Sequence, residues 1–209
     1  MFRHTYQTGC LSILYSLRGK NPLQSWKRHG EQHFVHGLTG NEWGCISAYG
    51  DVKSVRDEDI ESYVVEIMGA NVQMTGITCP RDNSDSLAVR LPFFVMIVKN
   101  MKRYFMFEVE VIDDKNKHRR FIASNFRTAT RVGQSVCLMP VTLDVGWNQV
   151  HFDLPGCTRL AYGTNYRETV RVRVFANCRI RSVFFCDRIY AEETLPPEYK
   201  LFLPIQVKA

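Results

Sequence analysis

The sequence predicts an all-β fold, a single-domain antiparallel β-sandwich with a few short helical turns. From Ser62 onward, most of the chain consists of short apolar or alternating segments that are typical of strands. Turn residues separate these segments at roughly the 8–12-residue spacing of a sandwich, and long patterns with the 3.6-residue period of a helix are absent. A chain of 209 residues is long enough for one well-buried domain and short for two.

The first clear strand pattern predicts a hairpin. Residues 63–68 and 72–79 are strand-like and flank Gly69-Ala70-Asn71, which has the composition of a turn. The next run, FFVMIV at 93–98, is apolar on both faces and therefore indicates a central, buried strand. Pro92 cannot donate to a sheet, so it marks a bend or the start of that strand.

A second hairpin follows. Residues 104–112 alternate aromatic and aliphatic side chains with a face that carries Glu108 and Glu110, which is the pattern of a half-buried strand. The turn 113–116 and the return strand 119–124 complete the hairpin. Further along the chain, the sequence predicts two short strands and one helical turn, at residues 136–139, 148–154 and 155–162.

The segment 167–188 is predicted to form a hairpin that carries its positive charge in register. Valines alternate with Arg171 and Arg173 before the turn, and Arg179 and Arg181 follow it. A three-residue loop keeps the apolar side chains together and places Arg173 opposite Arg181. Because directly opposed like charges destabilise a sheet, we expect an acidic group to cover these arginines.

Residues 27–56 break the strand pattern and are predicted to be a loop insertion at an edge or partner-facing end of the sandwich. The segment holds five glycines and little periodicity. His29, His33 and His36, with Cys45 nearby, could be imagined as a zinc site. The glycines make a helix there improbable and no second ligand pair has metal-like spacing, so polar loop histidines are the better interpretation and no metal or other cofactor is predicted.

Composition narrows the partners and the compartment. The chain has 27 basic and 21 acidic residues and a net charge of +6, which favours acidic partners such as nucleic acid, an anionic membrane or an acidic protein surface. No apolar run has the length of a membrane-spanning helix, and the first residues lack the features of a secretory signal. Seven scattered cysteines without C-x-x-C spacing indicate a reduced, intracellular protein.

Catalysis is the minority hypothesis. Glu108 and Glu110 share one strand face about 7 Å apart in Cα, within the range used by glycosidases, but surface strands often carry alternating glutamates. No phosphate-loop, nucleophile-elbow or zinc-protease motif is present, so we predict a protein without catalytic residues. Trp147, Tyr162 and Tyr166 could instead stack on sugars or bases, although a core position is the better interpretation for Trp147 and both interpretations stay open for the tyrosines. A carbohydrate- or nucleic-acid-binding module is therefore the alternative.

Basic residues form the candidate binding surface. Two arginines per strand exceed what protection of a sheet edge needs, and arginine pairs bidentately with carboxylates. The segment KNMKRY and the strand after the second turn supply further charge. The predicted partner-binding set is Arg171, Arg173, Arg179, Arg181, Lys99, Lys102, Arg103, Arg119 and Arg120.

Long stretches of the chain resemble one known family. The strings LPFFVMIVKNMKRYFMFEVEVIDDKN, RFIASNFRTATRV, GWNQVHFDLP, AYGTNYRETVRVRVFANCRIR and LPPEYKLFLPIQVKA are similar, in this order, to the cilia- and flagella-associated protein twenty family. The resemblance covers nearly the whole chain. Residues 27–56 depart from it, because their glycines and histidines are not typical of the family.

The resemblance implies a jelly-roll-like sandwich, similar in shape to carbohydrate-binding modules and without established catalytic activity. It also implies a structural protein of the axoneme, at the inner junction of ciliary doublet microtubules. The implied partners are α/β-tubulin and the Parkin co-regulated gene protein, with no membrane and no expected nucleic acid. The implied locations are the axoneme and basal body, with an additional cytoplasmic or nuclear pool. Since tubulin surfaces are acidic, we expect the basic sheet face to contact them.

Overall fold

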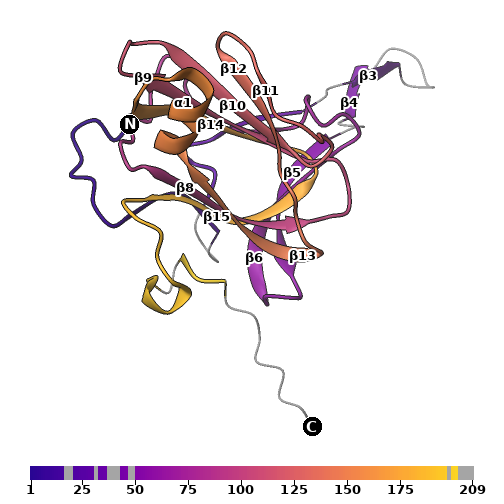
Figure 1. Ribbon diagram of the computed structural model, residues 1–209. Coiled ribbons are helices and arrows are strands. Elements are labelled where there is room, and N and C mark those ends of the chain that lie inside the picture. Colours follow the sequence, from indigo (N-terminus) through magenta and orange to yellow (C-terminus); the bar gives the residue numbers. More distant parts are fainter. Residues whose placement is uncertain (17–20, 31–32, 37–42, 47–49, 197–198, 202–209) are drawn as a thin grey trace.

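Two β-sheets pack face to face around a shared apolar core (Figure 1). This arrangement confirms the predicted all-β sandwich. No helix in the described part of the chain combines the length and the apolar character needed to cross a membrane. The computed structural model describes residues 1–16, 21–30, 33–36, 43–46, 50–196 and 199–201.

The first sheet has six strands. Its order is β13-β8-β15-β6-β5, and β1 pairs with the second half of β15. All of its pairs are antiparallel. The strands are β1 (Cys10–Tyr15), β5 (Gly50–Asp57), β6 (Ser62–Gly69), β8 (Phe93–Asn100), β13 (Gly146–Asp153) and β15 (Cys178–Cys186).

The second sheet has seven strands in the order β11-β12-β10-β9-β14-β7-β2. The β10–β12 pair is parallel, so the mostly antiparallel sandwich contains one parallel pair. A separate two-stranded sheet pairs β3 (His33–His36) with β4 (Trp43–Ile46). The strands of the second sheet are β2 (Lys27–His29), β7 (Gly76–Cys79), β9 (Met106–Asp113), β10 (His118–Ser124), β11 (Arg131–Val132), β12 (Val136–Pro140) and β14 (Tyr166–Phe175).

A nine-residue helix, α1 (Leu154–Tyr162), replaces the single predicted turn. Asp153 caps its first turn by accepting a hydrogen bond from the backbone N–H of Gly156 at 3.0 Å. Gly163 ends it in the left-handed conformation that glycine adopts without a steric cost. A 3-10 helix, Glu192–Thr194, precedes the C-terminal segment.

Two of the three predicted hairpins are wrong. β9 and β10 pair as expected, with Glu108 opposite Ile122. β6 and β7, however, belong to different sheets, and so do β14 and β15. Arg173 therefore lies opposite Glu108 of β9 and Thr78 of β7, whereas the predicted hairpin placed it opposite Arg181.

The β6–β7 and β14–β15 connections between the sheets lie side by side. The backbone N–H of Ala176 donates to the carbonyl of Thr75 at 2.9 Å. The side-chain oxygen of Asn177 accepts from the backbone N–H of Gly69 at 2.8 Å. Both connections cross between the layers at one end of the sandwich, and the β8–β9 and β12–β13 connections cross there as well. This end also carries the concavity described below.

Residues 27–56 are more regular than predicted. Their first residues form β2, an edge strand of the second sheet, and their last residues form most of β5, an edge strand of the first sheet. The expectation of a loop is therefore wrong for these parts. The three residues of β2 are too few to give a period-two signal. Both β2 and β5 are the outermost strands of their sheets.

Aromatic side chains join the two sheets. The ring of Phe107, on β9, lies 5.7 Å from that of Phe94 and 5.5 Å from that of Phe152, which belong to the first sheet. A second apolar cluster lies on the outer side of the first sheet, where Tyr199 of the C-terminal segment packs on Phe184 with ring centroids 4.6 Å apart. The C-terminal segment therefore covers part of that outer face.

Candidate functional site

The structure divides the predicted arginines between the two sheets. Arg171 and Arg173 lie on β14, and Arg179 and Arg181 lie on β15. Arg171 and Arg181 are each only 6% exposed. Because the strands are in different layers, these four side chains do not form one continuous basic face.

Carboxylates of β9 neutralise the arginines of the second sheet. β9 lies between β10 and β14, which places Glu108 and Glu110 between arginines on both sides. The guanidinium of Arg120 donates to both oxygens of the buried Glu108 carboxylate, at 2.9 and 2.7 Å, and this hydrogen bonding raises the pKa of Arg120. Arg173 also contacts Glu108, and Arg171 lies 3.9 Å from Glu110.

Arg171 has further partners outside the sheet. Its guanidinium donates to the backbone carbonyls of Asn83 and Asp85, at 2.8 and 3.0 Å. The side chain thus anchors the 80–86 segment against the outer face of the second sheet. Its position is that of a structural residue rather than of an exposed contact.

On the first sheet, Asp57 pairs with basic side chains as Glu108 does on the second sheet. Its fully buried carboxylate accepts hydrogen bonds from Lys99 at 2.8 Å, from Arg179 at 2.7 Å and from the indole N–H of Trp147 at 3.2 Å. Arg179 also binds Glu66 at 2.7 Å. Lys99, Arg179 and Trp147 are therefore parts of one internal cluster.

The remaining strand arginines of the predicted set, Arg119 and Arg181, also interact with other residues of the chain. Arg119 donates to Asp113 at 3.0 Å, and its guanidinium lies 4.2 Å from the ring centroid of Tyr162. Burial lowers the pKa of Arg181, and Tyr15 partly offsets this effect.

Tyr166, one of the candidate stacking residues, donates from its buried hydroxyl to the carbonyl of Val89 at 2.8 Å.

Two members of the predicted set differ from the others. Lys102 and Arg103 are exposed, and neither of their side chains takes part in an ion pair or hydrogen bond found among the described residues. They lie in the loop between β8 and β9, at the rim of a concavity of about 710 Å³. Its lining residues are Gly69, Ala70, Val72, Asn100, Lys102, Arg103, Tyr104, Asn125, Arg127, Val141, Thr142, Leu143 and Asn177.

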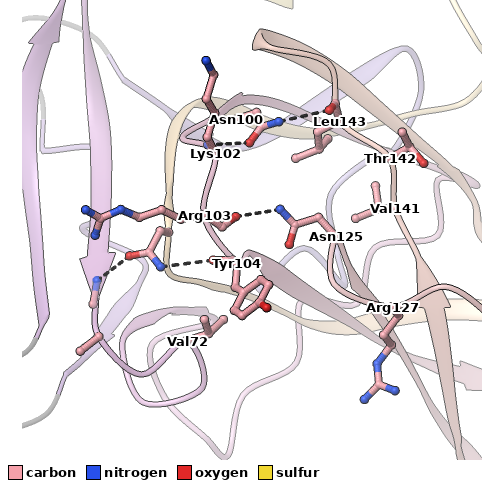
Figure 2. Close-up of a pocket in the computed structure, with 13 residues that line it drawn as sticks. Val72, Asn100, Lys102, Arg103, Tyr104, Asn125, Arg127, Val141, Thr142 and Leu143 are labelled. Atoms are coloured by element: carbon pink, nitrogen blue, oxygen red, sulfur yellow. Dashed lines mark hydrogen bonds between the residues drawn. The ribbon is translucent and has the colours of Figure 1, made fainter.

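Three asparagines hold the loop backbone (Figure 2). The side-chain oxygen of Asn100 accepts from the N–H of Lys102 at 2.9 Å. The side-chain amide of Asn125 donates to the carbonyl of Arg103 at 2.8 Å. That of Asn177 donates to the carbonyl of Tyr104 at 3.2 Å. The asparagines thus fix the backbone, while the charged ends of Lys102 and Arg103 point away from it.

Arg127 adds a third cation that the sequence interpretation missed. It follows β10 and borders the same concavity, with Tyr104 between it and Arg103 in Figure 2. Its Nε is buried and has no hydrogen-bond partner within the structure. The Tyr104 ring, 67% exposed, packs edge-on with that of Phe126, 39% exposed, at 5.3 Å. The available sequence signal was the basic string RTATR, which lies outside any strand pattern.

Charge, shape and rigidity combine at this site. The lining residues include three cations and no carboxylate. We call this surface the basic concavity. A surface of this kind is suited to an anionic group, because arginine and lysine side chains without internal partners can donate hydrogen bonds to it.

The prediction of polar loop histidines without a metal is one that the structure does not test. Among the described residues, no group of three or more histidine, cysteine, aspartate or glutamate side chains is placed to hold a metal ion. The side chains of His33, His36 and Cys45 lie outside them. His29 packs against Phe175 with ring centroids 5.8 Å apart, and burial lowers its pKa.

Comparison with known proteins gives a match over almost the whole chain. The CFA20 domain model matches residues 1–203. A relative from Paramecium tetraurelia, named cilia- and flagella-associated protein 20, is 52% identical over 206 residues, which is 99% of this chain and 98% of the relative. The protein of the same name from Chlamydomonas reinhardtii is 51% identical over 99% of both chains.

Solved structures show only distant likeness. A Clostridium thermocellum endo-1,4-β-D-xylanase 10B structure with CBM22-1 and GH10 modules matches with a TM-score of 0.42 and 10% identity, over 87% of this chain and 29% of the other. An exo-β-agarase matches with a TM-score of 0.35 and 9% identity, over 89% of this chain and 26% of the other. At these TM-scores neither structure bears on function.

Proposed function

Because the chain belongs to the CFA20 domain family, whose relatives are cilia- and flagella-associated proteins, we propose that it is a non-enzymatic structural protein of the axoneme. In this role it binds tubulin and neighbouring proteins, including the Parkin co-regulated gene protein, at the inner junction of doublet microtubules. The match over residues 1–203 is the observation that carries the proposal.

The charge distribution supports an acidic partner. The net charge is +6, and the strand arginines are largely neutralised by Glu108, Glu110, Asp57 and Glu66. Within the predicted partner-binding set, Lys102 and Arg103 at the basic concavity keep their charge without a carboxylate partner among the described residues. A positive surface of this kind favours association with acidic proteins such as tubulin.

A nucleic-acid-binding module is the second candidate. Exposed Tyr104 and Phe126 lie beside Arg103 and Arg127, and single-stranded nucleic acids bind surfaces that combine aromatic rings with cations. This alternative predicts that a labelled oligonucleotide shifts in a gel with the purified protein. The structural role predicts no such shift at physiological ionic strength.

The test uses isolated axonemes. A tagged copy of the chain is expressed in ciliated cells that lack the native protein, and axonemes are extracted at increasing salt concentration. We expect the protein to remain with the axoneme at low salt and to leave as salt screens its charges. Cross-linking before extraction should connect it to tubulin. Absence from the axoneme fraction at every ionic strength would contradict the proposal.

The structure also determines which variants are informative in such a test. Reversing the charge of Arg173 and Arg181 would leave Glu108 without one of its partners and place a carboxylate at the buried position of Arg181. Such changes destabilise the fold, so a loss of binding could not be assigned to an interface. Lys102 and Arg103 are exposed and suit the purpose.

A further inference from the structure

We propose that the basic concavity is the docking site for an acidic, extended peptide segment of a partner protein. This inference rests on the proposed function, because it names the surface and the partner chemistry that the axonemal role would use. It assigns the binding to Lys102, Arg103 and Arg127 rather than to the strand arginines.

The strand arginines and the cations of the basic concavity differ in whether a carboxylate of the chain pairs with them. Arg120, Arg173 and Arg179 each contact a carboxylate of the chain itself. Over the described parts of the chain, no carboxylate pairs with Lys102, Arg103 or Arg127. An anionic ligand at this surface can therefore pair with these cations without displacing a carboxylate of the chain.

The second argument is the fixed backbone of the loop. Asn100, Asn125 and Asn177 hold the three consecutive residues Lys102, Arg103 and Tyr104 by their backbone N–H and carbonyl groups. Ordering a loop on binding costs conformational entropy, and a loop that is already held avoids much of that cost. The asparagines therefore hold, in advance of any contact, the backbone that carries two charged side chains and one exposed ring.

The third argument is the chemistry of the walls. Val72, Val141 and Leu143 line the concavity beside its cations. Glutamate has an apolar stem and a carboxylate end, so its stem can contact these side chains while its charge reaches Arg103 or Arg127, which bind carboxylates bidentately. The volume of about 710 Å³ is sufficient for a few side chains and lies within the range of ligand sites.

A peptide fits this surface better than a nucleic acid does. Single-stranded nucleic acids bind along a groove that follows the phosphate backbone, whereas these three cations border one concavity. Tyr104 packs edge-on with Phe126, which restricts its use as a stacking platform. The partner chemistry that the site favours is therefore a run of carboxylates on a flexible segment.

The experiment measures binding of a fluorescently labelled oligoglutamate peptide to the purified full chain by anisotropy. The test variant is K102Q/R103Q, and the matched control is K115Q/K117Q. The control removes the same charge from the exposed turn between β9 and β10. We expect the test variant to weaken binding about tenfold, because it loses two charge-assisted contacts. The control should change binding less than about twofold.

Several outcomes would overturn the inference. Equal weakening by both variants would show a response to net charge alone. Tighter binding of an oligonucleotide of equal charge, lost in K102Q/R103Q, would assign the concavity to nucleic acid. Circular dichroism and the thermal midpoint verify that both variants fold, and R127Q provides an independent removal of charge at the same site.

The inference and the proposed function fail in different ways. If K102Q/R103Q loses the peptide but the wild-type chain is absent from axonemes, the docking site stands and the axonemal role fails. If the wild-type chain is retained in axonemes but binds no oligoglutamate, the role stands and the docking site is wrong.

Discussion

Asp57 shows how a single residue organises the first sheet. A buried charge is costly unless it is paired and hydrogen-bonded, and its carboxylate has three donors in Lys99, Arg179 and Trp147. Burial alone raises the pKa of Asp57, but these donors outweigh burial and hold the pKa below its ordinary value. The cluster around Asp57 therefore connects four strands of the first sheet, β5, β8, β13 and β15.

Replacing Asp57 by asparagine should destabilise the protein strongly. The variant leaves Lys99 and Arg179 without their shared buried partner, which costs about 3 to 5 kcal/mol of unfolding free energy. D59N is the control, because Asp59 also binds Lys99 but its side chain is 53% exposed. We expect D59N to cost less than about 1 kcal/mol. Urea unfolding measures both, and equal losses would contradict the role of Asp57.

The same residue gives a pH dependence of defined sign. Because folding lowers the pKa of Asp57, its contribution to stability is present above the pKa of the unfolded state, about 3.9, and is lost as pH falls through the folded value. The difference in unfolding free energy between wild type and D57N should therefore shrink below about pH 4. A difference that stays constant on acidification would show that protonation of Asp57 does not matter.

At the residue scale, the sequence predicted the need for an acid but not its source. The alternation of valines with Arg171 and Arg173 indicated a polar face that something acidic must cover. The structure supplies Glu108 and Glu110 from β9. A local pattern fixes which way a side chain points, whereas the neighbouring strand depends on tertiary topology, which one strand does not encode.

At the element scale, the connections between the sheets explain the main errors of prediction. β14 and β15 both alternate correctly, yet they enter different sheets. Alternation places residues on two faces in either arrangement, so it does not distinguish a hairpin from a crossover. The turn from β9 to β10 was predictable because Asp113 lies at a polar turn and accepts from the N–H groups of Lys115 and Lys117.

The pairing of β1 with β15 predicts a disulfide under oxidising conditions. Cys10 and Cys186 are directly opposite, with their sulfurs 3.1 Å apart, and opposed residues of antiparallel strands have Cα distances that suit a disulfide. Oxidised glutathione would take two electrons from the two thiols and become two glutathione molecules. We expect stability to rise by about 2 to 4 kcal/mol, measured by thermal unfolding.

Burial raises the pKa of the Cys186 thiol, so the reaction should accelerate with pH as the thiolate forms. Peptide mapping identifies the linked residues. C10S is the control, because it should block both the link and the gain in stability. A Cys10–Cys186 link that lowers the thermal midpoint would contradict the geometry that the strand pair provides.

At the scale of the whole molecule, the paired cations of the predicted set and the cations of the basic concavity occupy different places. Paired charges lie on the outer faces of the sheets, as with Glu108 and Asp57, and the basic concavity lies where the chain crosses between them. The string KNMKRY identified Lys102 and Arg103 from sequence. Arg127 and Asn177 join them only through the fold, because they come from distant segments.

The last prediction concerns the core that the two sheets share. Phe107 of the second sheet contacts Phe94 and Phe152 of the first and is fully buried. F107A should therefore cost about 3 to 5 kcal/mol of unfolding free energy, since it removes apolar contacts and leaves a cavity. L160A is the control, because Leu160 is 91% exposed, and it should change stability by less than about 0.5 kcal/mol.

Because Phe107 of the second sheet packs against rings of the first sheet, its loss should destabilise both sheets together. Far-ultraviolet circular dichroism reports on strands of both sheets, and fluorescence reports on the three tryptophans, Trp26, Trp43 and Trp147. We expect the two signals of F107A to change in one coincident transition, as they do in the wild-type protein. For F107A this transition should occur at a lower urea concentration. Two separate transitions would show that each sheet is stable by itself, and the shared core would then contribute less cooperativity than its aromatic contacts imply.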